Sequence, residues 1–308
     1  MDKPSSKFEI IHEIVSSGDS LLQVKELCEI AGVSRSGYYS WLKAAGTREK
    51  HEEQDRKDFE LILEAYRHRG YDKGVRGIYM RLLHVGIVMN QKKIRRLMRK
   101  YNLYCPIRKT NPYRQMMRAM KTDVTADNLV NREFEEHGPR MILLTDITYI
   151  RLNAQFVYLS AIIDAFTKQV LSYVLSDSLE VDFVLETVQQ LIDKHGEELL
   201  TDSLIHSDQG AHYTSIKFRE IISDAVLRQS MSRRGNCWDN APQESFFGHM
   251  KDELKSKSES WESIEDVKVC IDDWMDYYNN DRYQWDLAKL SPNEFYRYIT
   301  DGEYPLIK

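Results

Sequence analysis

Four charged residues are notable for their types and spacing: Asp146, Asp208, Glu244 and Lys251. Glu244 follows Asp208 after 35 intervening residues, and Lys251 follows Glu244 by seven positions. Carboxylates that converge from different elements suit Mg²⁺, which prefers hard oxygen ligands. Two such ions about 3.5–4 Å apart activate a nucleophilic oxygen and stabilise the leaving oxygen of a phosphodiester. The pattern is therefore typical of metal-dependent phosphodiester chemistry.

The two aspartates are predicted to lie on strands. Asp146 is in the middle of the apolar run 141–150, which predicts a buried strand. A charged side chain there is costly unless it is paired or metal-bound. Asp208 closes a second short apolar run, 204–208, and Gly210 follows it. This position indicates a strand-to-loop transition.

Glu244 is predicted to lie near the start of a helix, because residues 239–242 (DNAP) are typical of a helix start. Glu244, Gly248 and Lys251 then share one helical face, which places a metal ligand beside a cation that can contact a DNA phosphate. Each residue alone has an ordinary alternative, such as a paired structural aspartate, a glutamate that compensates the helix dipole, or a solvated Glu–Lys pair. Their joint order and spacing favour the catalytic interpretation.

Several segments around these residues match a known family. They are TDITY (145–149), HSDQG (206–210), YTS (213–215), GNCWDNA (235–241), ESFF (244–247), and Lys251, Glu253, Leu254, Tyr278, Asn279, Arg282, Leu287, Ser291 and Pro292. On these segments, nearly the whole chain resembles the OrfB-type insertion-sequence transposases, whose catalytic core is similar to that of retroviral integrases. A tryptophan expected just before the first motif is absent, which concerns packing and leaves the site assignment intact.

The resemblance implies an α/β fold, with an RNase H-like core and a mixed sheet, preceded by all-α helix-turn-helix domains. It implies Asp146, Asp208 and Glu244 as the catalytic and metal-binding triad, and Lys251 as a contact to the DNA end. The implied reaction is 3′-strand cleavage and strand transfer with two Mg²⁺ ions, for which Mn²⁺ substitutes. The implied partners are double-stranded DNA of the element ends and target, further copies of the chain, and an upstream-frame fusion or partner protein.

The charge distribution supports a nucleic-acid partner, although the net charge of the chain is −5. Residues 61–121 hold 16 Lys and Arg against two acids, a net +14, whereas residues 141–308 hold 16 against 29 acids, a net −13. A basic region beside an acidic one favours a DNA-binding part next to a carboxylate-rich core.

Without an apolar run of membrane length or a signal-peptide pattern, we expect a cytoplasmic bacterial protein that joins the nucleoid on binding DNA. Its four cysteines lack CxxC spacing and are expected to be reduced.

We expect six segments along the chain. They are a helix-turn-helix-like domain (1–45), a linker (46–58), a second, basic helix-turn-helix-like domain (59–104), a basic linker (105–140), the integrase-like core (141–257) and a C-terminal helical extension (258–308). In the first domain, Ser34 is predicted to cap the second helix of the motif, and Arg35 is the candidate for DNA contact. Packing against another protein is the alternative for this domain.

The second domain is the stronger candidate for DNA binding. Gly86 is predicted to turn the chain, and Asn90 to cap a helix whose apolar face lies between residues 94 and 98. Its other face carries the cations Lys92, Lys93, Arg95, Arg96, Arg99 and Lys100. We expect these to contact phosphates, which gives affinity more than sequence readout. In the linker that follows, Arg108 and Lys109 are expected to lie along DNA.

The core is predicted to have the order β-β-β-α-β-α-β-α. After the strand at 141–150, the predicted elements are 156–163 (strand), 170–175 (strand), 181–195 (helix), 204–208 (strand), 216–226 (helix), 227–232 (strand) and the Glu244 helix. Asp164 is an alternative acid that we expect to be structural. In the C-terminal extension we expect Arg282 and Tyr283 to pack against the core, with DNA contact as the alternative. Solvated acids are expected at Asp272, Asp273 and Asp276.

Two other functions compete with strand transfer. A nuclease of the same fold class would hydrolyse DNA without joining it, and would have little use for a region of net charge +14. A non-catalytic DNA-binding regulator would not need the triad, and the presence of all three carboxylates with Lys251 argues against it.

Overall fold

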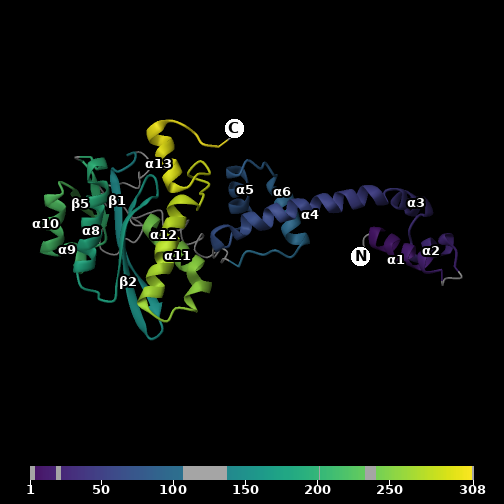
Figure 1. Ribbon diagram of the computed structural model, residues 1–308, viewed down its shortest axis with the longest axis horizontal. Coiled ribbons are helices and arrows are strands. Elements are labelled where there is room, and N and C mark those ends of the chain that lie inside the picture. The colour runs from purple at the N-terminus through teal and green to yellow at the C-terminus, as the bar shows by residue number, and fades with distance from the viewer. Residues whose placement is uncertain (1–3, 19–21, 107–136, 201, 233–240, 307–308) are drawn as a thin grey trace, which may run out of the picture. The chain divides into compact units, whose positions relative to one another are not determined.

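The computed structural model describes residues 4–18, 22–106, 137–200, 202–232 and 241–306. The chain divides into two compact units, residues 1–63 and 64–308 (Figure 1). The boundary falls inside one helix, α4 (Ala45–Arg67). Residues 46–58, predicted as a linker, are therefore helical. Charged residues such as those of 46–58 favour a helix whenever they can form pairs one turn apart, as Lys57 and Glu53 do at 2.8 Å.

The first unit has a helix-turn-helix outline. It contains α1 (Pro4–Ser17), α2 (Val24–Ala31) and α3 (Arg35–Lys43), whose buried side chains are Ile11, Leu27, Cys28 and Tyr38. Gly32 ends α2 with φ 66°, a conformation that glycine adopts without strain. The Ser34 side chain accepts a hydrogen bond from the Gly37 N–H at 3.1 Å, so the predicted cap of α3 is confirmed.

The second unit begins with a small helical region, residues 64–106, which we call the basic block. It contains the end of α4, the 3₁₀ turn η1 (His68–Gly70), α5 (Val75–His84) and α6 (Gln91–Lys100). The turn at Gly86 has φ 75°, and Asn90 caps α6 through the Lys92 N–H at 2.8 Å, both as predicted. The apolar side chains Ile94, Leu97 and Met98 of α6 are buried, which leaves its cations on the opposite face.

The rest of the second unit is built on a mixed five-stranded sheet in the order β3-β2-β1-β4-β5. The strands are β1 (Ile142–Leu152), β2 (Gln155–Asp164), β3 (Val170–Ser176), β4 (Leu204–Ser207) and β5 (Arg228–Met231). The first three are antiparallel, whereas β4 runs parallel to β1 and β5 parallel to β4. This arrangement is the predicted RNase H-like α/β core.

Helices cover both faces of the sheet (Figure 1). They are α8 (Asp182–His195), α9 (Ala211–Thr214) and α10 (Ile216–Asp224) on one face, and α11 (Ala241–Ser258) and α12 (Ile264–Asn280) on the other. The 3₁₀ turn η2 (Gly196–Glu198) follows α8, and α13 (Pro292–Asp301) packs against α12. Leu144 and Ile150 of β1 pack with α11 and α12, whereas Leu143 packs with α8 and α10. Even-numbered β1 residues therefore face α11, because side chains alternate along a strand.

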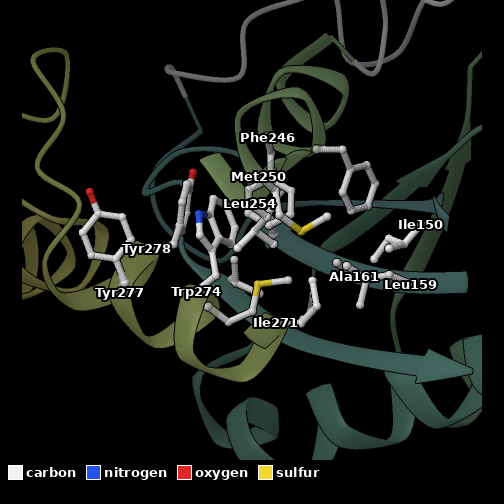
Figure 2. Packing of buried hydrophobic residues seen from close by; sticks show 14 of the residues in the cluster. Ile150, Leu159, Ala161, Phe246, Met250, Leu254, Ile271, Trp274, Tyr277 and Tyr278 are labelled. Carbon is white, nitrogen blue, oxygen red and sulfur yellow. The ribbon is translucent and has the colours of Figure 1, made fainter. Parts of the chain in front are cut away.

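The α11 face has an aromatic and sulfur-rich core. Figure 2 shows Phe246, Met250 and Leu254 of α11 between the strands and the α12 side chains Ile271 and Trp274. This packing fixes α11 against the sheet.

Among the described residues, no helix is both long and apolar enough to cross a membrane. The described cysteines, Cys28, Cys105 and Cys270, are thiols and not disulfides, as predicted.

The acidic side chains of α12 are exposed to solvent, as expected, with exposed fractions of 44% for Asp272, 47% for Asp273 and 56% for Asp276, and each also contacts another side chain. Asp272 accepts a hydrogen bond from the Tyr173 hydroxyl at 2.8 Å and Asp273 accepts one from the Tyr71 hydroxyl at 2.6 Å. Asp276 pairs with Arg69 at 2.5 Å. Helical periodicity identifies a polar face, but it does not show which distant side chains contact that face.

Of the two residues expected to pack against the core, Arg282 does so, whereas Tyr283 packs against the basic block. The Arg282 guanidinium pairs with Glu253 of α11 at 2.9 Å, and both side chains are largely buried. The Tyr283 ring stacks on His84 with ring centroids 3.6 Å apart. Arg282 is therefore a structural residue of the core.

Candidate active site

Asp146 lies on β1, and Asp208 directly follows the neighbouring parallel strand β4. The β1–β4 register ends with Leu144 opposite His206, and each aspartate lies two residues further along the chain. Parallel neighbours are about 4.8 Å apart. Because Asp146 is an even-numbered residue of β1, its side chain belongs to the face that packs against α11. The sheet thus brings the two carboxylates together at one edge.

Local hydrogen bonds orient both carboxylates. The Ile147 N–H donates to Asp146 Oδ1 at 2.8 Å, and the Gly210 N–H donates to Asp208 Oδ1 at 2.8 Å. A Cβ atom at position 210 would be 2.9 Å from that Asp208 oxygen, closer than ordinary van der Waals contact. Glycine therefore allows the turn to close on the carboxylate. In each aspartate, one oxygen is held by the backbone and the second is oriented with it.

Glu244 is in the first turn of α11, as predicted, and the residue before it anchors that turn to the sheet. The Gln243 side chain is fully buried and its Nε2 donates to the Ala161 carbonyl at 3.2 Å. Ala161 is the direct partner of Asp146 in the β1–β2 register. The start of α11 is thus fixed beside the strand position opposite Asp146.

The charges of these residues act on one another. Burial raises the pKa of Asp146 to about 7, and the negative charges of Asp208 and Glu244 act in the same direction. The Ile147 N–H and the Lys251 ammonium oppose this shift. Burial lowers the pKa of Lys251, and the charge of Asp146 acts against that change. A cation bound beside Asp146 would therefore relieve a repulsion that the folded chain contains.

The three carboxylates do not yet share a common coordination point. Among the described residues, no group of three or more His, Cys, Asp or Glu side chains is close enough to hold a metal ion as it stands. Glu244 and Asp208 are exposed, whereas Asp146 is partly buried. The rotamer of an exposed glutamate at a helix start changes at little cost, so the backbone geometry is compatible with a shared site.

Asp164, the alternative acid, is committed to a structural pair. It is fully buried and its Oδ2 lies 3.0 Å from Arg140 Nη1, which also donates to the Gln169 side chain. Arg140 makes a second ion pair with Glu198 at 2.8 Å. This network joins the start of the core to the end of β2, so Asp164 has the structural role expected from the sequence.

Two residues near the carboxylates were not predicted. Gln243 gives no sequence signal, because an amide in a first helical turn is usually exposed. Tyr213 belongs to a motif that marks the resemblance, but the motif alone gives it no role. Its side chain is buried, and burial together with the charge of Asp146 raises the pKa of its hydroxyl, which lies near Thr145.

The structure describes the predicted DNA-contacting residues of α6 and α3, but not those of the linker that follows α6. In α6, Lys93 is half-buried, and the exposed cations are Lys92, Arg95, Arg96, Arg99 and Lys100. Arg35 is exposed at the first position of α3. Arg108 and Lys109 lie outside the described residues. The helices therefore present cations to solvent in both helix-turn-helix regions.

Comparisons with known proteins give a consistent assignment. Models of the integrase core domain match residues 136–237 and 226–292, and an HTH-like domain model matches residues 53–111. The chain is 32% identical over 272 residues to the putative transposase InsK for the insertion sequence element IS150 of Escherichia coli K12, covering 88% of this chain and 92% of that protein. It is 28% identical to a putative transposase for IS986/IS6110 of Mycobacterium tuberculosis, with coverages of 82% and 91%.

Solved integrase structures are also similar to the chain. The catalytic core domain of HTLV-2 integrase in complex with magnesium, in a dimeric form, is 15% identical and aligns with a TM-score of 0.40. The alignment covers 51% of this chain and 97% of that one.

Proposed function

Because the chain belongs to the insertion-sequence transposases with an integrase core domain, and is thus a polynucleotidyl transferase of DNA transposition, we propose that Asp146, Asp208 and Glu244 are its catalytic triad. The observation that carries this proposal is the register of β1 and β4. It aligns Asp146 with Asp208 on the sheet face covered by α11, the helix that bears Glu244. Lys251, on the same helix, is the proposed contact to the DNA end.

The triad is also the proposed site for Mg²⁺, with two ions in the active complex and Mn²⁺ as a substitute. The donor set fits, because it consists of carboxylate oxygens and one of them is destabilised by its negative neighbours. Bound there, the metal would supply the activation of the attacking hydroxyl and the stabilisation of charge on the leaving oxygen.

The protein's own residues prepare this chemistry. The backbone N–H groups of Ile147 and Gly210 orient two of the ligands before substrate binds. Lys251 places a positive charge near the carboxylates, where a DNA phosphate must approach. The reaction needs no covalent protein–DNA intermediate, because a 3′-hydroxyl of the cleaved strand attacks the target phosphodiester directly.

The DNA partners are proposed to be the terminal inverted repeats of a mobile element and a target duplex. The α6 cations, Lys92, Lys93, Arg95, Arg96, Arg99 and Lys100, together with Arg35, Arg108 and Lys109, are the proposed phosphate contacts. Two ends must be brought together, so we propose that the chain acts as a homo-oligomer on DNA. We also propose that the chain acts with an upstream-frame protein, as a fusion or as a partner. When bound to DNA, it would be associated with the bacterial nucleoid.

The test is strand transfer by the purified full chain. Labelled duplexes from the DNA that flanks its gene are incubated with Mg²⁺ and either the wild type or Asp208→Asn, while DNA binding is measured by fluorescence anisotropy. The proposal requires joined strands with the wild type and their loss in the variant at unchanged DNA affinity. The reaction is repeated with the chain fused to its upstream-frame product.

Two outcomes would replace the proposal. Cleavage without joined products would identify a nuclease, because hydrolysis needs the same carboxylates but no strand transfer. Binding without cleavage or joining, even in the fused form, would identify a DNA-binding regulator.

A further inference from the structure

The polar face of α12 contacts the basic block. Arg69 lies against three acids of the C-terminal region, with distances of 2.5 Å to Asp276, 3.5 Å to Asp273 and 3.6 Å to Asp281. His68 adds a contact of 3.0 Å to Asp281. Several half-exposed pairs that share partners hold an orientation better than one isolated surface pair. Some basic side chains of the basic block are therefore paired with acidic side chains of the C-terminal region within the second unit.

An aromatic contact lies beside these ion pairs. Tyr71 is 2% exposed and its ring stacks on Tyr277 of α12, with centroids 4.2 Å apart. Its hydroxyl donates to Asp273 at 2.6 Å, and the Lys257 ammonium of α11 lies 3.9 Å from the ring centroid. A buried tyrosine whose hydroxyl is hydrogen-bonded contributes buried apolar surface and also a directional hydrogen bond. Tyr71 thus joins the basic block to α11 and α12 at one point.

A second contact lies further along the block, on α5. The His84 ring stacks on Tyr283, and its Nε2 lies 3.1 Å from Glu294 of α13. The Arg81 guanidinium donates to the Tyr283 hydroxyl at 3.3 Å. Two separated points of contact restrict rotation as well as translation, so the block has one orientation on the C-terminal helices.

The same helix α12 supports the active-site helix. Phe246 of α11 packs against Trp274 and Tyr278, with centroid distances of 5.4 Å and 4.9 Å (Figure 2). The Trp274 indole N–H donates to Glu253 of α11 at 3.0 Å. One face of α12 therefore holds α11, with Glu244 and Lys251, while another holds the basic block.

The backbone of Arg69 has a conformation that is unfavourable for a residue with a side chain. Its φ is 61° and its ψ is 7°, in the left-handed region that costs a non-glycine residue about 1 kcal/mol or more. Gly70 follows with φ 68°. A glycine at position 69 would avoid this cost, so the guanidinium contacts with α12 offset the strain.

We propose that α12 is a docking surface that holds the basic block at a fixed position relative to the active site, with Arg69 and Tyr71 as positioning residues. The inference rests on the proposed function, in which the block binds DNA and the triad acts on that DNA. Strand transfer requires the reacting phosphodiester to be placed to within a fraction of an ångström. A basic block docked on α12 would help to position the bound DNA at the active site. A basic block connected to the core only through the chain would increase DNA affinity without positioning the DNA.

The main test is Arg69→Gly, which removes the guanidinium and leaves a residue that suits the backbone. We expect duplex affinity to stay within about twofold, because the α6 cations remain. Joining should fall by about tenfold or more, because the DNA is no longer held in place. Arg67→Gln is the matched control: it removes one exposed positive charge two residues away and should not separate joining from binding.

A charge exchange separates positioning from general damage. Asp276→Arg alone should lower joining as Arg69→Gly does, and Arg69→Asp combined with Asp276→Arg should recover a large part of it. Non-additive recovery identifies a direct interaction between the two positions. Thermal unfolding of each variant shows whether the fold is retained.

Hydrogen exchange tests the docking itself without any reaction. Amides of residues 68–84 in the full chain should exchange faster in Arg69→Gly than in the wild type. Unchanged exchange, or joining that falls only in proportion to DNA affinity, would overturn the docking surface while leaving the proposed function intact. If the wild type does not join DNA, the proposed function fails, and the exchange experiment alone decides whether α12 holds the block.

Discussion

Substituting Gly210 by alanine tests how the Asp208 carboxylate is held. The new Cβ would lie 2.9 Å from Asp208 Oδ1, whereas ordinary contact begins at 3.4 Å, so the carboxylate must move by about half an ångström. Position 210 has φ −60° and ψ 152°, which alanine adopts without strain. The fold should therefore keep its stability or gain about 0.4–1 kcal/mol.

The effect on the reaction should be much larger than the effect on the fold. A displacement of up to 1 Å at a reacting group costs as much as about 100-fold in rate, so we expect Gly210→Ala to slow joining by about 10- to 100-fold. Joined product is quantified over time on labelled duplexes, beside DNA affinity and thermal unfolding. Gly46→Ala, on an exposed stretch of α4 with nothing within 4 Å of its new Cβ, is the control for glycine replacement. A wild-type rate in Gly210→Ala, or a loss that follows its unfolding temperature, would refute the reasoning.

Two further predictions concern buried ionic contacts. Asp164→Asn removes the fully buried charge partner of Arg140, whose guanidinium keeps its ion pair with the partly exposed Glu198, so urea unfolding should show a loss of about 1–3 kcal/mol; a loss below about 0.5 kcal/mol would contradict the pair. Burial alone would raise the pKa of Glu294, but hydrogen bonds from His84 and the α13 cap lower it below 4.5. Glu294 should therefore stabilise the fold at neutral pH and lose this effect as the pH falls below about 4.5. Glu294→Gln should melt earlier than wild type at pH 7, with a gap that narrows in acid; a constant gap would contradict this.

The core could be predicted from the sequence because its signals are local. Apolar runs gave the positions of the strands to within one or two residues, as for β2, predicted at 156–163 and observed at Gln155–Asp164. Ser34 and Asn90 marked helix starts because a side-chain oxygen there accepts a nearby backbone N–H. The three carboxylates of the proposed triad were chosen from family motifs, and the strand register places two of them at corresponding positions along β1 and just beyond β4.

What could not be predicted depends on long-range packing. Asp273 meets Tyr71, which is 202 positions earlier in the chain, and no pattern within α12 indicates that contact. Gln243 is buried only because α11 lies against β2, so its anchoring role appears with the tertiary structure. Residues 46–58 were predicted to be a linker but form part of a continuous helix. A charged segment without an apolar face is compatible with either a linker or an exposed helix, so the sequence pattern could not distinguish the two.

Divalent-ion binding tests the central claim most directly. Isothermal titration with Mg²⁺, on the full chain bound to an uncleaved duplex, compares the wild type with Asp146→Asn and Asp208→Asn. Asp182→Asn, an exposed carboxylate on α8, serves as the control for loss of one negative charge. We predict saturable Mg²⁺ binding in the wild type and the control, and its loss in both triad variants. Equal binding in all four proteins would contradict the assignment of the site.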